Sequence, residues 1–250
     1  MARMRLVNWC IASVLVLAAS CGGSESADRP CARVSALVNG SAVAPPELGV
    51  APASVVAVVV RHQDHPDDAT LCTGVRLDDR HVATAAHCFD DDPSAMVTIL
   101  SDATVSSSLR CAPTASPAAG QVQAFRLHPQ RDLAVIDTAP SLETQTRPCD
   151  VTTEVGSMVY AAGYGLDEDG KLGTRRYLAT QVVTSSDDAI GTQATSAAGT
   201  CVGDSGGPLF VADGGQACVA GTLFTGSADC RGLGRYVPMT AVAGWIAGAR

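Results

Sequence analysis

The chain has 250 residues, of which 46% are hydrophobic and only 4% aromatic, enough for two modest barrels or one large domain with a core of Val, Ala and Leu. Its formal net charge is −8 and its only lysine is Lys171, which excludes nucleic acid and a polybasic mode of membrane binding. Ten cysteines are too many for an ordinary cytosolic enzyme and indicate an oxidising compartment.

The beginning of the chain is typical of an exported protein. Arg3 and Arg5 precede an apolar run from Cys10 to Ala19 that is too short to span a membrane, which predicts a signal peptide. The run ends in Leu-Ala-Ala-Ser-Cys, which resembles the lipobox of bacterial lipoproteins and implies that Cys21 carries the lipid. Plain secretion, with Cys21 as an ordinary thiol, is the alternative. We expect export to the bacterial cell envelope, with membrane contact through the lipid anchor only.

Composition divides the chain into three parts. Residues 1–20 form the expected signal peptide, and residues 21–36 are small and polar, as in a tether or propeptide. The expected folded domain spans residues 37–250, with a crossing between two halves near residues 137–154, where Pro and Thr are frequent.

Several segments carry a local structural signal. The β-branched run Val55–Val60 predicts a buried strand, Tyr177–Val183 alternates as a strand, and Ala241–Ile246 has helical spacing. The loop 61–68 holds two histidines and three acids, and Asp90–Asp92 holds three acids, so either segment could bind a metal ion. Solvated loops are favoured, because neither has the spacing of a dedicated site. We expect no metal ion or cofactor.

Three segments further along carry residues suited to nucleophilic catalysis. Cys72 and Cys88 bracket a hairpin, and a bridge between them would fix the backbone of His87 and contribute about 3 kcal/mol. Asp132 opens an apolar strand, where a carboxylate is costly unless it is hydrogen-bonded. Ser205 lies in a Gly-rich turn whose backbone N–H groups could approach a substrate oxygen. The alternatives are a core histidine for His87 and a surface turn for Ser205.

Together these segments resemble the motifs of trypsin-like serine proteases. The matching stretches are Thr84-Ala85-Ala86-His87-Cys88, Asp132-Leu133-Ala134-Val135 and Gly203-Asp204-Ser205-Gly206-Gly207-Pro208, and they occur in the family's order of His, Asp and Ser. An esterase of the α/β-hydrolase kind is disfavoured, because its order is Ser, Asp, His.

The resemblance implies a fold and a mechanism. The expected fold is all-β, with two antiparallel six-stranded Greek-key β-barrels packed together and a short C-terminal helix. The expected triad is Ser205 as nucleophile, His87 as base and Asp132 as its partner. The N–H groups of Gly203 and Ser205 form the expected oxyanion hole.

The resemblance also implies activation by cleavage. Leu37-Val38-Asn39-Gly40 is similar to the Ile-Val-Gly-Gly start of the mature enzymes, where a newly freed amino group pairs with the acid before the nucleophile. That acid is Asp204 here, and the cut would follow Ala36. We therefore expect a zymogen.

The substrate pocket is expected to be uncharged. Family pattern places Gly199 at its floor, where trypsin itself has Asp, and Gly226 and Gly234 on its walls. These glycines would leave the pocket open, which predicts a preference for a medium or large apolar residue before the cut bond. The serine that commonly supports the catalytic Asp is missing, with Phe224 or Thr225 near its place.

Cysteine pairing is only partly determined by the sequence. The resemblance implies the bridge Cys201–Cys230, and Cys72–Cys88 is the other secure pair. Four further cysteines, Cys31, Cys111, Cys149 and Cys218, allow three pairings. We favour Cys149–Cys218 together with Cys31–Cys111. The alternative suggested by the family is a bridge between Cys31 and Cys149.

Two functional hypotheses remain open. The first is an active serine endopeptidase, monomeric, acting on proteins or peptides. The second is a catalytically silent relative that serves as a binding module on the cell envelope. The complete His-Asp-Ser set favours the first hypothesis. The missing serine near Phe224 keeps the second hypothesis open.

Overall fold

The computed structural model describes residues 37–62, 65–105, 122–140, 146–150, 152–194, 197–213 and 216–248, with only the backbone of residues 65–68 and 213. All of these belong to one compact unit, Cys31–Arg250. The signal peptide, the tether and the lipid-bearing Cys21 fall in residues 1–36, outside the described residues, and so does Cys111.

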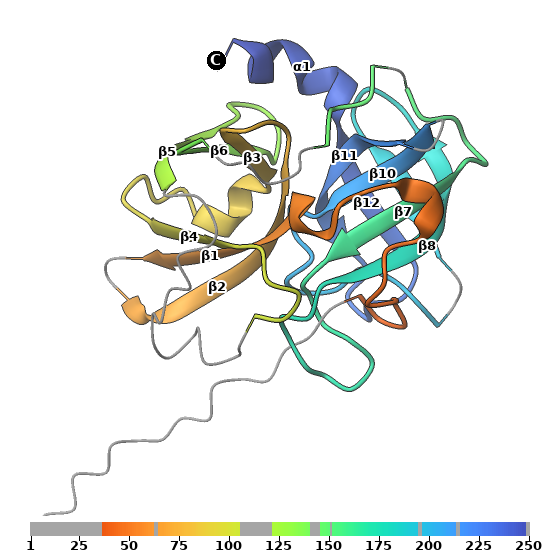
Figure 1. Cartoon of the computed structure of the whole chain (residues 1–250), viewed down its shortest axis with the longest axis horizontal. Coiled ribbons are helices and arrows are strands. Elements are labelled where there is room, and N and C mark those ends of the chain that lie inside the picture. The colour runs from red at the N-terminus through yellow and green to blue at the C-terminus, as the bar shows by residue number, and fades with distance from the viewer. Residues whose placement is uncertain are drawn as a thin grey trace, which may run out of the picture. The chain divides into compact units, whose positions relative to one another are not determined.

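The described part of the chain forms twelve β-strands, three short 3-10 helices and one α-helix (Figure 1). In chain order their bounds are η1 Pro46–Leu48, η2 Pro52–Ser54, β1 Val55–His62, β2 His65–Arg76, β3 His81–Thr84, η3 Ala86–Phe89, β4 Met96–Leu100, β5 Val122–Leu127, β6 Ala134–Thr138, β7 Met158–Gly163, β8 Arg176–Ser185, β9 Ile190–Gln193, β10 Pro208–Asp213, β11 Gln216–Gly226, β12 Leu233–Pro238 and α1 Met239–Ala247.

The strands form two six-stranded antiparallel sheets with the same connectivity. The first has the order β4-β1-β2-β3-β6-β5, and the second is a closed barrel with the order β10-β11-β12-β9-β8-β7. Position by position, β4 corresponds to β10, β1 to β7 and β3 to β9. The difference is that β10 pairs with β11, whereas no such ladder joins β4 to β5 in the described residues. The predicted all-β fold of two barrel-like sheets is confirmed.

The predicted strand Val55–Val60 forms most of β1, and every one of its six residues is buried. Alternate side chains of a strand point to opposite faces. Val56, Val58 and Val60 pack among residues of the first sheet, and Val55 and Val59 join a cluster that includes residues of both sheets. The strand is apolar throughout because both of its faces are covered.

Three apolar clusters hold the fold together. One consists of first-sheet residues and neighbouring loops, with Phe89 stacked on Phe125 at a ring-centroid distance of 4.4 Å. A second lies within the closed barrel and includes Leu37. The third draws on both sheets and on α1, with members such as Leu133, Phe210 and Ile246. The two sheets therefore share a core, which fixes loops of one against loops of the other.

Helix α1 follows β12 directly and confirms the helix expected near the C-terminus. It buries Met239, Val242 and Ile246 along one side, at the spacing of an amphipathic helix. Trp245 packs beside them, with the Arg126 guanidinium 5.6 Å from its ring centroid. No helix in the described ranges is long and apolar enough to cross a membrane.

Candidate active site

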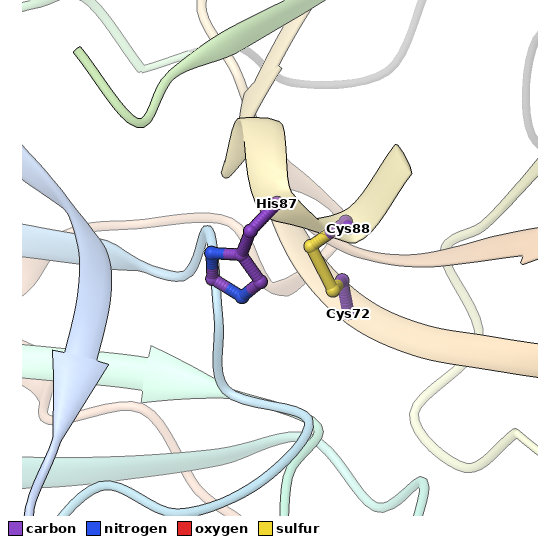
Figure 2. A group of neighbouring side chains, drawn as sticks. All are labelled: Cys72, His87 and Cys88. Atoms are coloured by element: carbon purple, nitrogen blue, oxygen red, sulfur yellow. A yellow bond between two sulfur atoms is a disulfide. The ribbon is translucent and has the colours of Figure 1, made fainter. Parts of the chain in front are cut away.

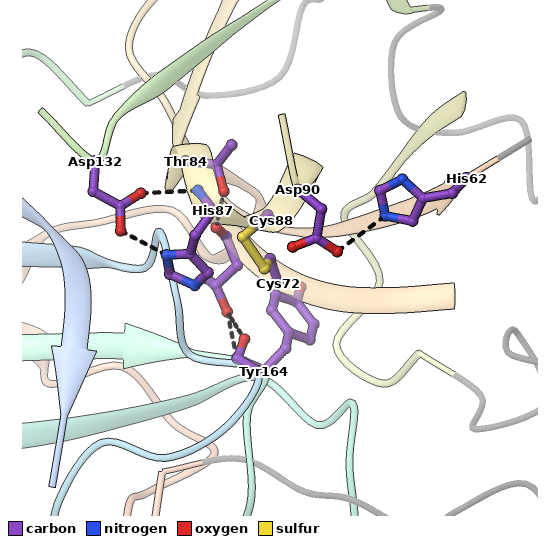
Figure 3. Close-up of a disulfide and its surroundings, with 10 residues drawn as sticks. His62, Cys72, Thr84, His87, Cys88, Asp90, Asp132 and Tyr164 are labelled. Carbon is purple, nitrogen blue, oxygen red and sulfur yellow. Dashed lines mark hydrogen bonds and ion pairs between the residues drawn. A yellow bond between two sulfur atoms is a disulfide. The ribbon is translucent and has the colours of Figure 1, made fainter. Parts of the chain in front are cut away.

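His87 and Asp132 are hydrogen-bonded to each other. His87 lies in η3, and its Nδ1 is 2.6 Å from Oδ2 of Asp132, while its backbone N–H donates to Oδ1 at 2.9 Å (Figure 3). The bond from Asp132 raises the pKa of His87 above 6.5, against the effect of burial. Burial alone would raise the pKa of Asp132, but hydrogen bonds from His87 and from the Ala86 N–H outweigh it, and this pKa lies below 3.8. The pair is an ionisable unit with the imidazole held in one orientation.

The Ser205 turn lies against the segment that leads into His87. The Thr73 N–H donates to the Ser205 carbonyl at 2.8 Å, so β2 holds the turn. A Cβ built on Gly206 would lie 2.5 Å from the Ala85 backbone nitrogen, which shows how closely the two segments approach. In the described residues, no hydrogen bond joins the Ser205 hydroxyl to His87. In unliganded enzymes this contact is often long or poorly aligned.

The backbone N–H groups of this turn divide into two sets. Those of Asp204, Gly206 and Gly207 each donate to a backbone carbonyl, at 3.1, 2.7 and 2.8 Å. Those of Gly203 and Ser205 form no such bond within the described chain. Gly203 has φ +94°, a conformation that favours glycine and turns its peptide away from the regular ladder. Two N–H donors are therefore left available at one turn.

The described residues form three disulfides, two of which adjoin this region. Cys72–Cys88 ties β2 to η3 beside His87, and Cys201–Cys230 ties the Ser205 turn to the loop before β12. The third, Cys149–Cys218, is the pairing we favoured, and it excludes the alternative in which Cys149 joins Cys31. Its expected companion Cys31–Cys111 lies outside the described residues.

Cys72, His87 and Cys88 lie close enough together to resemble a metal site, as Figure 2 shows. Both sulfur atoms, however, belong to the disulfide. Metal binding by cysteine needs a free thiolate, so this cluster offers only the His87 nitrogen.

The two acidic segments considered as metal sites meet at His62. The Nδ1 of His62 is 3.1 Å from Asp92 Oδ2, and its Nε2 is 3.5 Å from Asp90 Oδ2 (Figure 3). Each carboxylate contacts a different nitrogen of the ring, which suits a bridging imidazole better than a shared ion. This contact fastens the loop after Cys88 to the end of β1.

Phe224 occupies a bulge of β11, where the pairing with β12 shifts between Leu223 and Thr225. Its ring packs against the core shared by the two sheets, and the Arg235 guanidinium lies 5.6 Å from the ring centroid. Phe224 offers no side-chain hydrogen bond, so Asp132 depends on donors from η3. The expectation that the usual supporting serine is missing fits this geometry.

Two of the three glycines of the expected pocket line a small cavity that also carries several hydroxyls. The space that the centre of a water molecule can occupy there is only about 10 Å³, and Gly199 and Gly234 are part of its lining. A Cβ on Gly226 would lie 2.6 Å from Thr200 Oγ1, so the threonine takes up space that we expected to be open. The buried hydroxyls that line the cavity are those of Thr180, Thr192, Thr200 and Tyr236. No carboxylate lines this cavity within the described residues.

Most of these hydroxyls lack a hydrogen-bond partner in the described structure. This holds for Thr180, Thr200 and Tyr236. Burial raises the pKa of Tyr236, and the neighbouring Thr192 offsets part of that rise. The cavity is uncharged but polar at its base.

Leu37 and Asp204 lie together in the interior. Leu37 is fully buried, and the next N–H, from Val38, donates to the Gly199 carbonyl at 3.1 Å. The Asp204 carboxylate accepts from the N–H groups of Cys201 and Gly165, both at 2.8 Å, and from that of Leu37. Burial nevertheless raises the pKa of Asp204 to about 7.

A polar anchor holds the turn that follows Leu37. The backbone N–H of Asn39 donates to Glu168 Oε2 at 3.0 Å, and the Arg176 guanidinium binds the same carboxylate at 2.9 Å and the Gly40 carbonyl at 3.2 Å. Sequence reasoning did not find this anchor, nor the buried Thr73 beneath the Ser205 turn. The one available signal for Thr73 was a polar residue inside an otherwise buried strand.

Comparisons with known proteins agree with this arrangement. The family model described as Trypsin matches residues 47–246. The structure of human heparin binding protein is similar, with a TM-score of 0.62 and 21% sequence identity, over 84% of this chain and 95% of that chain. At this identity the likeness concerns the fold. A comparison with curated proteins finds no match. Because the family model covers most of its length, the chain belongs to the trypsin family.

Proposed function

We propose that the chain is a serine endopeptidase. The observation that carries this proposal is the 2.6 Å contact between His87 Nδ1 and Asp132, next to a turn whose Gly203 and Ser205 N–H groups donate no backbone hydrogen bond within the described chain. A histidine held by a carboxylate, a nearby hydroxyl and two converging N–H donors are the groups that acyl transfer requires.

Each group has a defined step in the proposed reaction. The Ser205 hydroxyl attacks the carbonyl carbon of the scissile bond while His87 Nε2 takes its proton. Asp132 holds the ring and stabilises the imidazolium. The developing oxyanion accepts hydrogen bonds from Gly203 and Ser205, each worth about 2.7–4 kcal/mol in the transition state. His87 then protonates the leaving amine, and water hydrolyses the acyl-enzyme by the reverse sequence. No step needs a cofactor.

The proposal extends to substrate and processing. The uncharged lining around Gly199 supports an uncharged residue before the cut bond, and the glycine faces support an apolar one. Cleavage after Ala36 would give Leu37 a free amino group next to Asp204, which supports a zymogen. Export, the lipid on Cys21 and a monomeric state complete the proposal. Heparin binding, which is in the name of the similar human protein, is not carried over, because the net charge is −8.

The test is covalent labelling of Ser205 with a fluorophosphonate, together with peptide hydrolysis. The wild-type protein, processed to begin at Leu37, should be labelled and should cleave peptides. Ser205→Ala should lose the label and about 10⁶ in kcat. Near-normal hydrolysis by Ser205→Ala would show that this serine is not the nucleophile.

The second candidate is a silent relative that binds other envelope proteins. The usual supporting serine is missing, with Phe224 or Thr225 near its place, which favours this candidate. So does the absence of a Ser205–His87 hydrogen bond among the described residues. This candidate predicts a folded, processed protein that neither reacts with the fluorophosphonate nor cleaves peptides.

A further inference from the structure

Thr73 occupies the place where the two sheets meet beneath the nucleophile turn. It follows Cys72 on β2 and is fully buried. Its polar groups are all engaged. The hydroxyl donates to the Gly203 carbonyl at 2.8 Å and accepts from the Tyr164 N–H at 2.9 Å, and the backbone N–H donates to the Ser205 carbonyl at 2.8 Å.

The same residue is joined to the strand that leads to His87. The Thr84 hydroxyl donates to the Thr73 carbonyl at 2.7 Å. Thr84 ends β3, three residues before His87, and Thr84 and Tyr164 are both labelled in Figure 3. Hydrogen bonds therefore lead from the histidine segment through Thr73 to the turn that holds Ser205.

The bonds matter because the turn itself is conformationally soft. Gly203 and Gly206 have φ of +94° and +80°, and glycine in this region has wide freedom of rotation. The Gly203 carbonyl belongs to the peptide that follows the proposed oxyanion donor, so a restraint on this oxygen limits rotation of the residue whose N–H must face the substrate. Within the described hydrogen bonds, the only side chain that binds this carbonyl is that of Thr73.

We propose that Thr73 is a positioning residue whose hydroxyl holds the Gly203 N–H in its oxyanion-binding orientation. This rests on the proposed peptidase function, but its effect is on geometry and does not involve contact with substrate. A neutral hydroxyl suits this place, because it can donate to the Gly203 carbonyl and accept from Tyr164 at the same time.

The test compares three variants in the processed protein. Thr73→Val keeps the branched shape but leaves the Gly203 carbonyl and the Tyr164 N–H without partners, and kcat should fall about 10- to 100-fold with little change in KM. Inhibition by a peptidyl boronic acid, whose tetrahedral adduct uses the oxyanion hole, should weaken by a similar factor. Thr73→Ser should recover most of both.

The matched control is Thr222→Val. Thr222 is also fully buried, and its hydroxyl has no hydrogen-bond partner in the described structure. The change therefore replaces a buried threonine by valine, as in Thr73→Val, but breaks no hydrogen bond. It should leave kcat and boronate inhibition near those of the wild type. Equal values for the two valine variants, or no recovery with Thr73→Ser, would overturn the proposal. If Thr73→Val fails to fold, Thr73→Ala is measured in its place.

Amide hydrogen exchange separates this inference from the proposed function. The amides of residues 201–207 should exchange faster in Thr73→Val than in Thr222→Val, whether or not the protein hydrolyses anything. If the wild type proves inactive, the proposed function fails, and exchange alone decides the positioning role. Unchanged exchange across these amides would refute it.

Discussion

The buried Asp204 predicts that the uncleaved chain loses activity relative to the processed chain as pH rises. In the intact chain Leu37 contributes a peptide N–H and not an ammonium group, because residue 36 precedes it. Burial raises the pKa of Asp204 from 3.8 to about 7. Since the folded-state pKa is the higher one, folding favours the protonated carboxyl. We call the Ser205 loop closed when the Asp204 carboxyl is buried and open when it is exposed to water. The closed loop is most stable at low pH, loses stability between about pH 4 and pH 7, and does not change further above that.

The size of the effect follows from these two values. With a pKa of 3.8 in the open loop and about 7 in the closed loop, closure is about 100-fold less favourable at pH 8 than at pH 5. This corresponds to about 3 kcal/mol. An ammonium group on Leu37 removes the penalty, because it supplies the charge that the three N–H groups only partly replace.

The assay compares two forms of the protein, one that retains residues 22–36 and one that begins at Leu37. The rate of fluorophosphonate labelling at Ser205 is measured from pH 5 to pH 8. Both forms need neutral His87, so the ratio of intact to processed rates cancels that dependence. The ratio should fall about 100-fold over this range. Above pH 8 the processed form should lose activity too, as the Leu37 ammonium gives up its proton.

Asp204→Asn in the intact form is the matched control, because it keeps the size of the side chain and cannot ionise. Its labelling rate, corrected for His87, should not change between pH 5 and pH 8. A ratio that stays constant in the parent protein, with residues 22–36 verified as intact, would refute this account of Asp204. Equal activity of both forms at every pH would also refute the zymogen.

The other predictions concern the base, the pocket and the anchor. Because Asp132 raises the pKa of His87 above 6.5, kcat/KM of the processed form should rise with pH through a midpoint above 6.5, and a midpoint below that value would contradict the pairing. Peptide libraries should show cleavage after uncharged, mainly apolar residues, and dominant cleavage after Arg or Lys would mean that Gly199 is not at the pocket floor. Cys21→Ser should move the protein from the membrane to the soluble fraction, because the acyl chains supply the affinity, and unchanged fractionation would argue for another tether.

The sequence alone predicted those features whose signal lies within a few neighbouring residues. The run Val55–Val60 predicted β1 because a strand buried on both faces has no polar positions. His87, Asp132 and Ser205 could be proposed as a triad because each has a distinctive neighbourhood of a few residues. The C-terminal helix was found for the same reason, from apolar residues at helical spacing.

The rest depends on contacts between residues far apart in the chain. Thr73 gains its role from Gly203 and Tyr164, and nothing near it in sequence indicates those partners. The anchor of Asn39 to Glu168 is of the same kind. The pocket was expected to be open because three glycines were aligned to it, but the space that they leave depends on where Thr200 points. Side-chain direction at a strand bulge or a turn is set by packing, and the order of residues alone does not determine it.

The strand order shared by the two sheets constrains how the chain can fold. In each sheet the third strand pairs with the sixth and the first with the fourth, so neither sheet can be completed by neighbouring hairpins alone. Pairings of high sequence separation form slowly, because loop closure must precede the contacts that stabilise it. The pairing of β9 with β12 requires residues as late as Tyr236. The strands of the first sheet are thus all synthesised well before the last strand of the second, and the Ser205 turn belongs to the half of the fold that is completed later.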